Sequence, residues 1–588
     1  MLPAGRFCRG SLAKWPSTLH IRDTTPRRHA SSLQAALAGT NYPVQNETGQ
    51  ESSLMKALTL PVDGEENVVP SSEHTVRTPP SELLQTLDSR GLVNQIVGSR
   101  GHFSKLTADP ETFKCGVYVG IDPTAPSLHI GHLLPLMALY WTGSLGFDTV
   151  ALVGDATAGI GDPTGRTTSR PVLSRDEIKS NTRRICEKLH RMSDNARSVR
   201  RSYSGEAQVP SSRHTVLTNS KWLHELSLMV SLRELGSAFR IGAMLSRDTA
   251  RTKVASKEGM SLSEFMYPVL QAHDWLHLRK TRKVHIQIGG SDQYGNIISG
   301  SNAVWSAFQN RLPSYKGKER DLIHSGPAGM TVPLLTTSSG AKFGKSAGNA
   351  VWLDPDFTDP FDFYTYFVGV SDEDVGHMLK IFTFLPLENV DEVMESHNLD
   401  RSKRIAQHEL AKQVTNLVHG TPIANRMSML HSLMFQPITR EGLRAFVAAF
   451  PNVKEPSDKK SDKKDKKADK KGDNEKNDSP IVNKEGVVVT IRKSSLDELP
   501  PARLLGQLGF ENIGSVSAAS RLIAAGGVYI GCLPSAEGAS DEDAGEVVTF
   551  KRFKDVGLDS AAEWEKFMVE GVLLVRSGKK GFRIIHVI

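Results

Sequence analysis

Two histidines separated by two residues, in His129-Ile130-Gly131-His132, lie where a predicted strand gives way to a predicted helix. The first turn of a helix exposes backbone N–H groups and a partial positive charge, so phosphate binds there, and Gly131 allows a nucleotide to approach the backbone. Both imidazoles can donate hydrogen bonds to phosphate oxygens. The motif predicts a phosphate-handling site, although two surface histidines near a helix start would give the same string.

A second candidate for phosphate handling is the Gly/Ser-rich stretch that contains Lys342-Phe343-Gly344-Lys345-Ser346. Its end resembles a P-loop, but a P-loop requires glycine at position 339, where the chain has Ser339 and places the glycine at Gly340. Two lysines on a flexible loop instead suit the negative charge that develops on a leaving pyrophosphate. An ordinary solvated loop is the alternative.

The glycine-rich run Gly159-Ile160-Gly161-Asp162-Pro163-Thr164-Gly165 follows a predicted strand and almost matches the dinucleotide-binding fingerprint. Its last glycine comes one position late, which argues against a nicotinamide or flavin site. Arg166 and Arg170 follow this run, and both can hold phosphates.

Three polar residues, Tyr267, Gln271 and Asp274, recur at positions i, i+4 and i+7 and therefore share one face of a predicted helix. Such a polar stripe is usually the solvated face of a helix. Here apolar neighbours surround it, which favours a pocket that recognises amino and hydroxyl groups.

Alternating strands and helices must position these residues. Capping boxes at Ser174/Glu177 and Ser261/Glu264 mark the starts of two helices. The alternation predicts an α/β fold with a parallel sheet, and such sheets bind ligands at the carboxyl ends of their strands. Directly after one strand, Gly290 permits close ligand approach and Asp292 can accept hydrogen bonds from ribose hydroxyls. The predicted strands are 117–121, 149–153 and 284–288, and the predicted helices are 132–140, 176–190 and 261–274.

Composition sets wider bounds on the 588-residue chain, which is long enough for several domains. Its 72 basic and 65 acidic residues give a net charge of +7, which permits an anionic partner without requiring one. The four cysteines lie far apart without a Cys-X-X-Cys pair, so neither a disulfide framework nor a zinc cage is expected. We found no run of about 18 apolar residues and expect no membrane-spanning helix.

The first 40 residues are rich in arginine and serine and nearly free of acids, which is typical of a mitochondrial transit peptide. A disordered basic tail that binds nucleic acid is the alternative. We expect disorder over 41–80 and a solvated linker over 453–484, where lysine and aspartate alternate. The expected domains between these segments are a catalytic domain over 81–352, a helical domain over 353–452 and a terminal domain over 485–588.

Taken together and in this order, the motifs resemble the tyrosyl-tRNA synthetases of class I. The resemblance is carried by Tyr118-Val119-Gly120-Ile121-Asp122-Pro123-Thr124-Ala125 ahead of the histidines, by Tyr267-Pro268 with Gln271 and Asp274, and by Gly290-Ser291-Asp292-Gln293. It implies a Rossmann-like parallel-sheet catalytic domain, an α-helical anticodon-binding domain and a C-terminal S4-like α+β domain. The transit-like start is similar to that of mitochondrial, fungal-like members and implies a location in the mitochondrial matrix.

The resemblance implies that the protein activates L-tyrosine with ATP and Mg²⁺ to tyrosyl-adenylate, transfers it to tRNA(Tyr), forms a homodimer and holds no metal of its own. Tyr118 and Asp274 would bind the phenol, Asp162, Tyr267 and Gln271 the ammonium, and Gln293 the carboxylate. The implied catalytic residues are His129, His132, Lys342, Lys345, Ser346, Arg166 and Arg170. The implied adenylate-binding residues are Gly120, Asp122, Thr124, Gly131, Gly290 and Asp292.

Some features depart from the family pattern or leave alternatives open. Many relatives have lysine where Arg166 stands, so its role is less secure. Tryptophanyl relatives share the signatures, but Tyr118 with Asp274 favours a phenol over an indole. The S4-like helix has only Arg521, so RNA contact there would depend on Lys551, Arg552, Lys554, Lys579, Lys580 and Arg583. The extended start and the basic segment Ser193–Arg213 suggest an alternative role in binding group I intron RNA, as in some fungal mitochondrial relatives.

Overall fold

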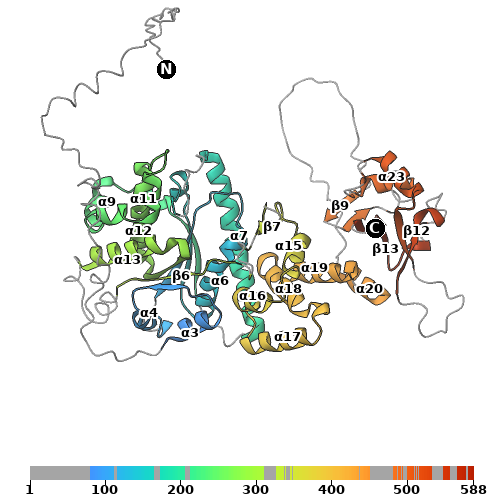
Figure 1. Ribbon diagram of the computed structural model, residues 1–588, viewed down its shortest axis with the longest axis horizontal. Helices are drawn as coiled ribbons and strands as arrows, with labels where there is room; N and C mark the ends of the chain where they lie inside the picture. Colours follow the sequence, from blue (N-terminus) through green and yellow to red (C-terminus); the bar gives the residue numbers. More distant parts are fainter. Residues whose placement is uncertain are drawn as a thin grey trace, which may run out of the picture. The chain divides into compact units, whose positions relative to one another are not determined.

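A computed structural model describes most of the chain from residue 80 onward (Figure 1). The described residues are 80–110, 115–164, 173–204, 212–309, 326–336, 338, 343, 345–346, 349–435, 437–449, 481–485, 488–491, 493, 500–508, 510, 513, 515–532, 547–556, 564, 566–577 and 581–587. The predicted transit peptide, the segment 41–79 and most of the predicted linker lie outside them.

The first domain is built on a six-stranded sheet in which neighbouring strands are parallel, except that β1 runs antiparallel to β6. The prediction of an α/β fold with a largely parallel sheet is therefore confirmed. The three predicted strands are central in the sheet, and their all-apolar runs fit strands that are covered on both faces. The strand order is β1 (Gln95–Val97), β6 (Ala328–Val332), β5 (Val284–Gly290), β2 (Gly116–Ile121), β3 (Thr149–Val153) and β4 (His214–Thr218).

Alternate residues of β2 pack on opposite faces of the sheet. Val117, Val119 and Ile121 join the core that includes residues of α6 (Ile130–Ser144) and α7 (Arg175–Ser204). Tyr118 joins a different core with residues of α12 (Leu262–Arg282) and α13 (Tyr294–Gln309). Figure 1 shows these two helix pairs on either side of the strands. The sheet is thus the middle of three layers.

Both predicted capping boxes are present. The Glu177 carboxylate accepts from the Ser174 backbone N–H at 2.8 Å, and the Ser261 hydroxyl accepts from the Glu264 N–H at 3.2 Å. Helix α7, however, continues fourteen residues past the predicted end at His190, to Ser204. The basic stretch that begins at Ser193 therefore starts inside this helix. Met192, Ala196 and Val199 are buried at helical spacing, and this apolar stripe extends the helix.

Shorter helices complete the first domain, and six α-helices follow it in the described residues, as expected for a helical region. Two buried cations of the first domain donate to carbonyl oxygens of the helical region: Arg90 to those of Thr383 and Leu385, and Lys188 to that of Val418. The shorter helices are α3 (Glu82–Ser89), α4 (Arg100–Leu106), α8 (Ser220–Leu223), α9 (Leu228–Glu234), α10 (Ile241–Leu245) and α11 (Asp248–Val254). The six that follow are α15 (Pro360–Val368), α16 (Val375–Phe382), α17 (Leu387–Leu399), α18 (Ile405–His419), α19 (Thr421–Phe435) and α20 (Arg440–Ala449).

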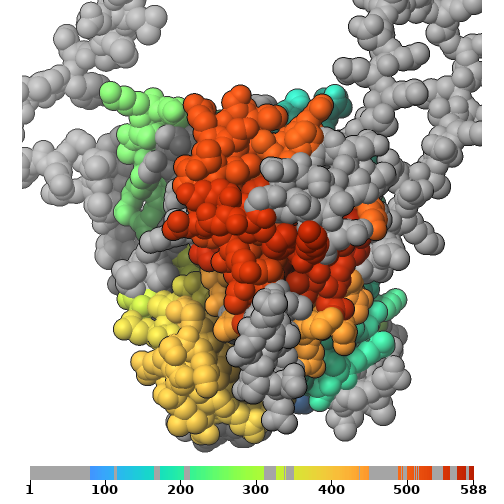
Figure 2. Space-filling model, turned by 90° about the vertical axis from the view of Figure 1, so that its right-hand side faces the viewer, coloured from blue at the N-terminus to red at the C-terminus, as the bar shows by residue number. Residues whose placement is uncertain are grey.

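The C-terminal domain mixes strands and helices, as predicted. Helices α22 (Pro501–Gln507) and α23 (Val516–Ala524) share a core with the sheet, and Figure 2 shows the described residues of these helices (orange) against those of the strands β11 to β14 (red). Helix α23 carries Arg521, as expected of the S4-like helix. The strand order is β12 (Thr549–Arg552), β11 (Val528–Cys532), β13 (Val572–Ser577), β14 (Gly581–Val587), β10 (Val488–Ile491) and β9 (Ile481–Glu485).

Candidate active site

Polar side chains that follow β2, β3 and β4 meet at the carboxyl-end edge of the sheet. Asp122 directly follows β2; its carboxylate accepts from the Tyr267 hydroxyl at 2.6 Å and from the Thr157 hydroxyl at 2.8 Å. Asn219 directly follows β4 and donates from its amide to the Thr157 hydroxyl at 3.1 Å. The parallel topology thus brings together residues almost 150 positions apart in the sequence.

Asp274 lies at the inner end of this network and is 4% exposed. One carboxylate oxygen accepts from the Asn219 amide at 3.0 Å and the other from the Trp222 indole N–H at 2.8 Å. Burial raises the pKa of Asp274 to about 7, against the lowering effect of the two hydrogen bonds. Trp222 also stacks on His277, with 4.2 Å between ring centroids, which fixes the indole donor.

The Tyr118 hydroxyl faces the same interior. Tyr118 is 1% exposed, and its hydroxyl has no hydrogen-bond partner among the described residues. Burial raises the pKa of Tyr118 well above its ordinary value, and the nearby charge of Asp274 raises it further. A buried hydroxyl without a partner costs about 1–3 kcal/mol, so the site suits a polar group that the described residues do not supply.

A second network contains amide side chains and Asp162. The Gln293 amide donates to the Asp162 carboxylate at 2.7 Å, and Gln271 donates to the Gln293 amide oxygen at 3.3 Å. Asn296 donates to the Gln271 amide oxygen at 3.1 Å. Asp162, Gln271 and Gln293 therefore lie together, as expected for one substrate, whereas Tyr267 donates to Asp122 and meets Asp162 only through its charge.

Asp292 lies beside this second network. Burial raises the pKa of Asp292, and the charge of Asp162 raises it further. A Cβ atom on Gly290 would lie 2.6 Å from a carboxylate oxygen of Asp292, so glycine is required there for close packing. Asp292 and Asn296 border a cavity of about 320 Å³, which also involves Pro163, Thr164, Met244, Arg247, Asp248, Thr249, Ala250, Met260, Phe265, Pro268 and Gly295.

The two motif histidines cap the start of α6. Nδ1 of His129 accepts from the Gly131 backbone N–H at 3.1 Å, and Nδ1 of His132 accepts from the His129 N–H at 3.1 Å. Because both Nδ1 atoms are acceptors, the proton of each neutral ring is on Nε2, which makes each Nε2 a donor. A Cβ on Gly131 would lie 2.9 Å from the His129 ring, so this glycine lets the imidazole fold over the helix start.

Two glycines and one loop threonine also lie at the carboxyl-end edge of the sheet. A Cβ on Gly120 would meet nothing within 4 Å, so this residue leaves open space at the end of β2. The Thr124 N–H donates to the Asp122 carbonyl at 2.8 Å and closes the turn after β2. A Cβ on Gly154, by contrast, would collide with the side chains of both Asp122 and Thr157.

Some predicted site residues lie outside the described residues: Arg166, Arg170, Lys342 and the side chains of Lys345 and Ser346. The backbone of Lys345–Ser346 forms β7, which pairs with β8 (Asn349–Ala350). Within the described part of the chain, no group of three or more His, Cys, Asp or Glu side chains is placed to hold a metal ion, and no helix has the length and apolarity needed to cross a bilayer.

Sequence reasoning missed four residues of the site, Thr157, Asn219, Trp222 and Asn296. Asn219 and Trp222 were missed because the edge strand β4 before them, with the sequence His-Thr-Val-Leu-Thr, has no continuous apolar run to mark it as a strand. Asn296 follows the motif Gly290-Ser291-Asp292-Gln293 by three residues, but only the fold shows that its amide reaches Gln271.

Comparisons with known proteins agree with this geometry. Residues 111–436, more than half of the chain, match the family "tRNA synthetases class I (W and Y)", and residues 480–588 match the "Tyrosyl-tRNA synthetase C-terminal domain". The mitochondrial tyrosine–tRNA ligase of Podospora anserina is 37% identical over 513 residues, which cover 86% of this chain and 75% of that protein. The human mitochondrial tyrosine–tRNA ligase is 41% identical over 58% of this chain and 68% of its own length.

Two solved structures are also similar. C-terminally truncated mitochondrial tyrosyl-tRNA synthetases of Aspergillus nidulans and Coccidioides posadasii are 38% and 41% identical, with TM-scores of 0.54 and 0.53. The similarity covers 60% and 59% of this chain and 94% and 91% of theirs. The chain therefore belongs to the class I tRNA synthetases for tryptophan and tyrosine, which use ATP as a substrate. Its activity is that of a mitochondrial tyrosine–tRNA ligase.

Proposed function

We propose that the carboxyl-end edge of the six-stranded sheet is the site where this ligase activates L-tyrosine. The observation that carries the proposal is the buried Tyr118 hydroxyl, unpartnered among the described residues, near the buried carboxylate of Asp274. A phenol suits both groups, because its O–H can donate to Asp274 and its oxygen can accept from Tyr118. Phenylalanine would leave the Tyr118 hydroxyl unpaired, at a cost of about 1–3 kcal/mol, and would offer Asp274 no further donor.

The second network serves the other end of the amino acid in this proposal. Asp162 and Gln271 bind the ammonium, with Tyr267 oriented by Asp122, and Gln293 lies at the carboxylate. Asp292 accepts from the adenylate ribose, and Gly120, Thr124 and Gly290 leave room for the nucleotide. Two networks that meet opposite ends of one small molecule can hold its carboxylate in the geometry of attack.

Activation then follows from position and charge. A carboxylate oxygen of tyrosine attacks the α-phosphorus of ATP, an O–P bond forms, and the bond to pyrophosphate breaks. The Nε2–H groups of His129 and His132 stabilise the charge on the phosphates. The sequence motif assigns pyrophosphate to Lys342, Lys345, Ser346, Arg166 and Arg170, with Mg²⁺ arriving bound to ATP. A hydroxyl at the 3′ end of tRNA(Tyr) next attacks the tyrosyl carbonyl, and AMP leaves.

Replacing Asp274 with alanine tests the phenol assignment. We expect ATP–pyrophosphate exchange with tyrosine to fall about 10- to 100-fold, because a hydrogen bond to a charged group is lost. Asp391→Ala, at an exposed carboxylate on α17 in the helical region, is the matched control and should leave exchange unchanged. Undiminished exchange in Asp274→Ala, or exchange of the wild-type protein with tryptophan alone, would overturn the assignment.

The proposed homodimer has a candidate surface on α9 and α10. Leu228, Met229 and Ile241 are 67%, 65% and 67% exposed, and Val230 and Leu232 lie beside them in α9. Exposed apolar side chains gathered in this way are typical of an interface between protein chains. Replacing Leu228 and Ile241 with glutamate should convert a dimer to a monomer in light-scattering measurements. Leu399→Glu, a control at a site that is 89% exposed on α17, should not.

The C-terminal domain is the proposed site of additional tRNA contact. Arg521, Lys551, Arg552 and Lys554 are exposed and offer phosphate contacts. Arg583 fits this role less well, because its guanidinium donates to the Leu508 carbonyl at 3.0 Å and lies over the Phe510 ring. Neutralising Lys551 and Arg552 should weaken tRNA binding and reduce its salt dependence by about two counterions. If the variant binds tRNA as tightly as the wild type, the proposed tRNA contact is wrong and the domain serves only in packing.

Group I intron RNA remains an alternative partner. The basic segment Ser193–Arg213 motivated this hypothesis, but Ser193–Ser204 belong to α7, and part of this stretch packs in the core. The hypothesis now rests mainly on the extended start of the chain. It is dismissed if the full chain binds intron RNA no more tightly than bulk RNA at matched salt.

We also propose that residues 1–40 are a transit peptide that directs the enzyme to the mitochondrial matrix. The composition of this segment is the support for the proposal. Amino-terminal sequencing of the enzyme recovered from mitochondria should begin beyond about residue 40. A start within the first few residues would contradict the proposal.

A further inference from the structure

The opposite edge of the same sheet carries a second cavity, of about 210 Å³. It lies where β3 and β4 begin, at the pair Thr149 and His214, whereas the proposed active site lies where these strands end. Helix α6 spans both edges: its first residues follow His129, and its last turn contributes Gly143 and Ser144 to the cavity. Helix α6 therefore contributes to both the active site and the second cavity, but no predicted active-site residue lines the second cavity.

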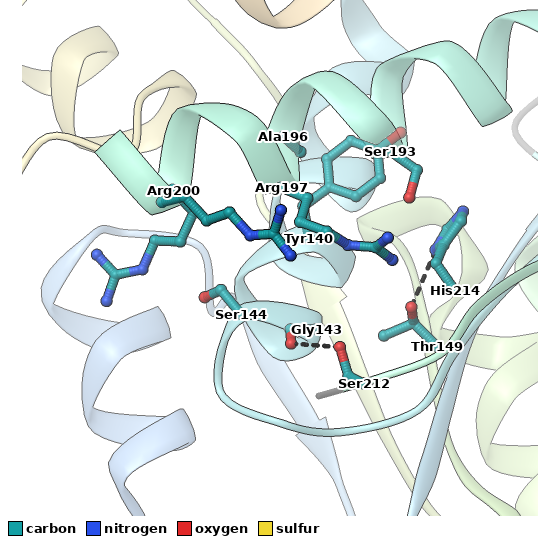
Figure 3. A pocket seen from close by; sticks show the side chains of 11 residues that line it. Tyr140, Gly143, Ser144, Thr149, Ser193, Ala196, Arg197, Arg200, Ser212 and His214 are labelled. Carbon is teal, nitrogen blue, oxygen red and sulfur yellow. Dashed lines mark hydrogen bonds between the residues drawn. The ribbon is translucent and has the colours of Figure 1, made fainter. Parts of the chain in front are cut away.

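Arginines dominate one wall of this cavity. Arg197, Arg200 and Arg201 project from adjacent turns of α7, and Figure 3 shows the Arg197 side chain extending from the helix towards His214. In the described part of the chain, none of the three forms an ion pair with a carboxylate. Two carboxylates act here by charge without forming such a pair: Asp194 opposes the lowering of the pKa of His214, and Glu82 opposes the lowering of the pKa of Arg200 by burial.

The positive charge is strong enough to affect neighbouring groups. The pKa of Arg90 is lowered to about 10, first by burial and then by the charge of Arg200. The pKa of His214 is lowered to about 4, by burial first and then by His190 and Arg197, so this histidine is neutral at physiological pH. The cavity therefore has an excess of positive charge and a neutral imidazole on its wall.

Two polar atoms at the cavity lack partners among the described residues, the Tyr140 hydroxyl and Nε2 of His214. Tyr140 is 6% exposed, so its hydroxyl has little access to bulk water. The hydroxyls of Ser144 and Ser212 already donate to the carbonyls of Trp141 and Gly143, at 2.8 Å and 2.7 Å. A hydroxyl that has donated still has lone pairs, so the new donors here are the Tyr140 hydroxyl and the guanidinium groups.

We propose that this cavity binds the phosphate group of a small phosphorylated ligand. A phosphate monoester carries almost two negative charges and three acceptor oxygens, which several guanidinium donors and one hydroxyl can satisfy together. Arginine pairs with phosphate oxygens in a bidentate way, and three arginines on adjacent turns fit this chemistry better than they fit one carboxylate. The buried position of Tyr140 favours a compact ligand over a nucleic acid backbone, which lies along a surface.

Phosphate binding to the full-length protein is measured by calorimetry and thermal unfolding at constant ionic strength, with inorganic phosphate and pyrophosphate as probes. Both probes should bind the wild-type protein and raise its unfolding midpoint. Part of the phosphate binding, and of the shift in the unfolding midpoint, should depend on the cavity arginines. The double variant Arg197→Gln/Arg200→Gln should lose this part. The matched control Arg183→Gln/Arg191→Gln removes two charges from the same helix away from the cavity and should keep it. Binding at the catalytic site is common to all these variants and cancels in the comparison.

A second variant keeps the proposal falsifiable if the double variant is unstable. Tyr140→Phe should weaken phosphate binding about 10- to 100-fold, the loss of one hydrogen bond to a charged group. Its unfolding midpoint without phosphate should stay unchanged or rise, because an unpartnered hydroxyl is removed. Equal phosphate binding by wild type and both arginine variants overturns the proposal. A Tyr140→Phe protein that is less stable but binds phosphate normally also overturns it. So does a result in which phosphate binds to none of the proteins while the arginine variant loses its binding to bulk RNA.

Discussion

Two tyrosine hydroxyls, at opposite edges of one sheet, are buried without a partner among the described residues: Tyr118 in β2 and Tyr140 in α6. Their surroundings differ in charge. Tyr118 faces the carboxylate of Asp274, whereas Tyr140 lies in a cavity bordered by arginines. A buried hydroxyl without a partner thus indicates a neutral hydroxyl ligand at Tyr118 and an anion at Tyr140. The neighbouring charge decides which ligand can offset the cost of burying the hydroxyl.

The two edges also differ in how completely their own charges are satisfied. At the carboxyl-end edge, Asp122 and Asp274 each accept at least two hydrogen bonds from side chains. At the amino-end edge, the arginines have no carboxylate partner within the described residues. A satisfied network positions a substrate with little reorganisation, whereas an unsatisfied cluster gains most of its stabilisation when a ligand arrives.

The largest predicted effect breaks the satisfied network. Gly154→Ala would place a Cβ against both Asp122 and Thr157, so their hydrogen bonds cannot persist in place. We expect kcat/KM for tyrosine to fall about 100-fold, as for a misplaced catalytic group, and the free energy of unfolding to fall by about 1–3 kcal/mol. Steady-state exchange kinetics and urea titration measure the two quantities.

Gly120→Ala is the control for that experiment. A Cβ there meets nothing within 4 Å, so the free energy of unfolding should change little. Because Gly120 is a proposed neighbour of the adenylate, the Gly120→Ala enzyme should have a higher KM for ATP and an unchanged free energy of unfolding. Equal destabilisation by both substitutions would show that Gly154 acts through backbone conformation and not through Asp122.

An intermediate effect concerns pH. Burial raises the pKa of Asp274 to about 7, so the carboxyl is increasingly protonated as the pH falls below 7 and loses the negative charge that strengthens its hydrogen bond from a phenol O–H. We expect kcat/KM for tyrosine to fall by up to about tenfold per pH unit below 7, since this parameter reports the free enzyme. Asp274→Asn should be slow at every pH and should lack this ionisation. A wild-type profile that stays flat from pH 5 to 8 would contradict the pKa.

The sequence predicted much of the carboxyl-end edge and nothing of the amino-end edge. His129, Asp274 and Gln293 belong to motifs whose spacing is visible along the chain, because each motif lies within one element or at one junction. The arginine cavity has no such motif: Arg197 lies on a helix, His214 begins a strand, and Tyr140 belongs to another helix. Only the parallel pairing of β3 with β4 and the length of α7 bring them together.

The same distinction explains the smaller errors. The predicted helix 176–190 ended too early because Arg197, Arg200 and Arg201 dominate the composition of the next segment, whereas three small or apolar residues on the other face continue α7. Likewise, Trp222 could not be recognised as a partner of Asp274, because 52 residues separate the two and no periodicity connects them. Sequence patterns reveal what one element does by itself and miss hydrogen bonds between elements.

The smallest predicted effect compares the two hydroxyls directly. Tyr118→Phe removes a hydroxyl that we assign to substrate recognition, so KM for tyrosine should rise about tenfold, as expected for one hydrogen bond. Tyr140→Phe should leave the same KM unchanged, because this residue lies at the other edge of the sheet. In both variants the free energy of unfolding should stay within about 0.5 kcal/mol of wild type or increase, since neither hydroxyl has a partner to lose. Exchange kinetics and chemical unfolding of the two variants in parallel check this, and a loss of more than about 1 kcal/mol in either protein would reveal a partner that satisfies that hydroxyl without any ligand.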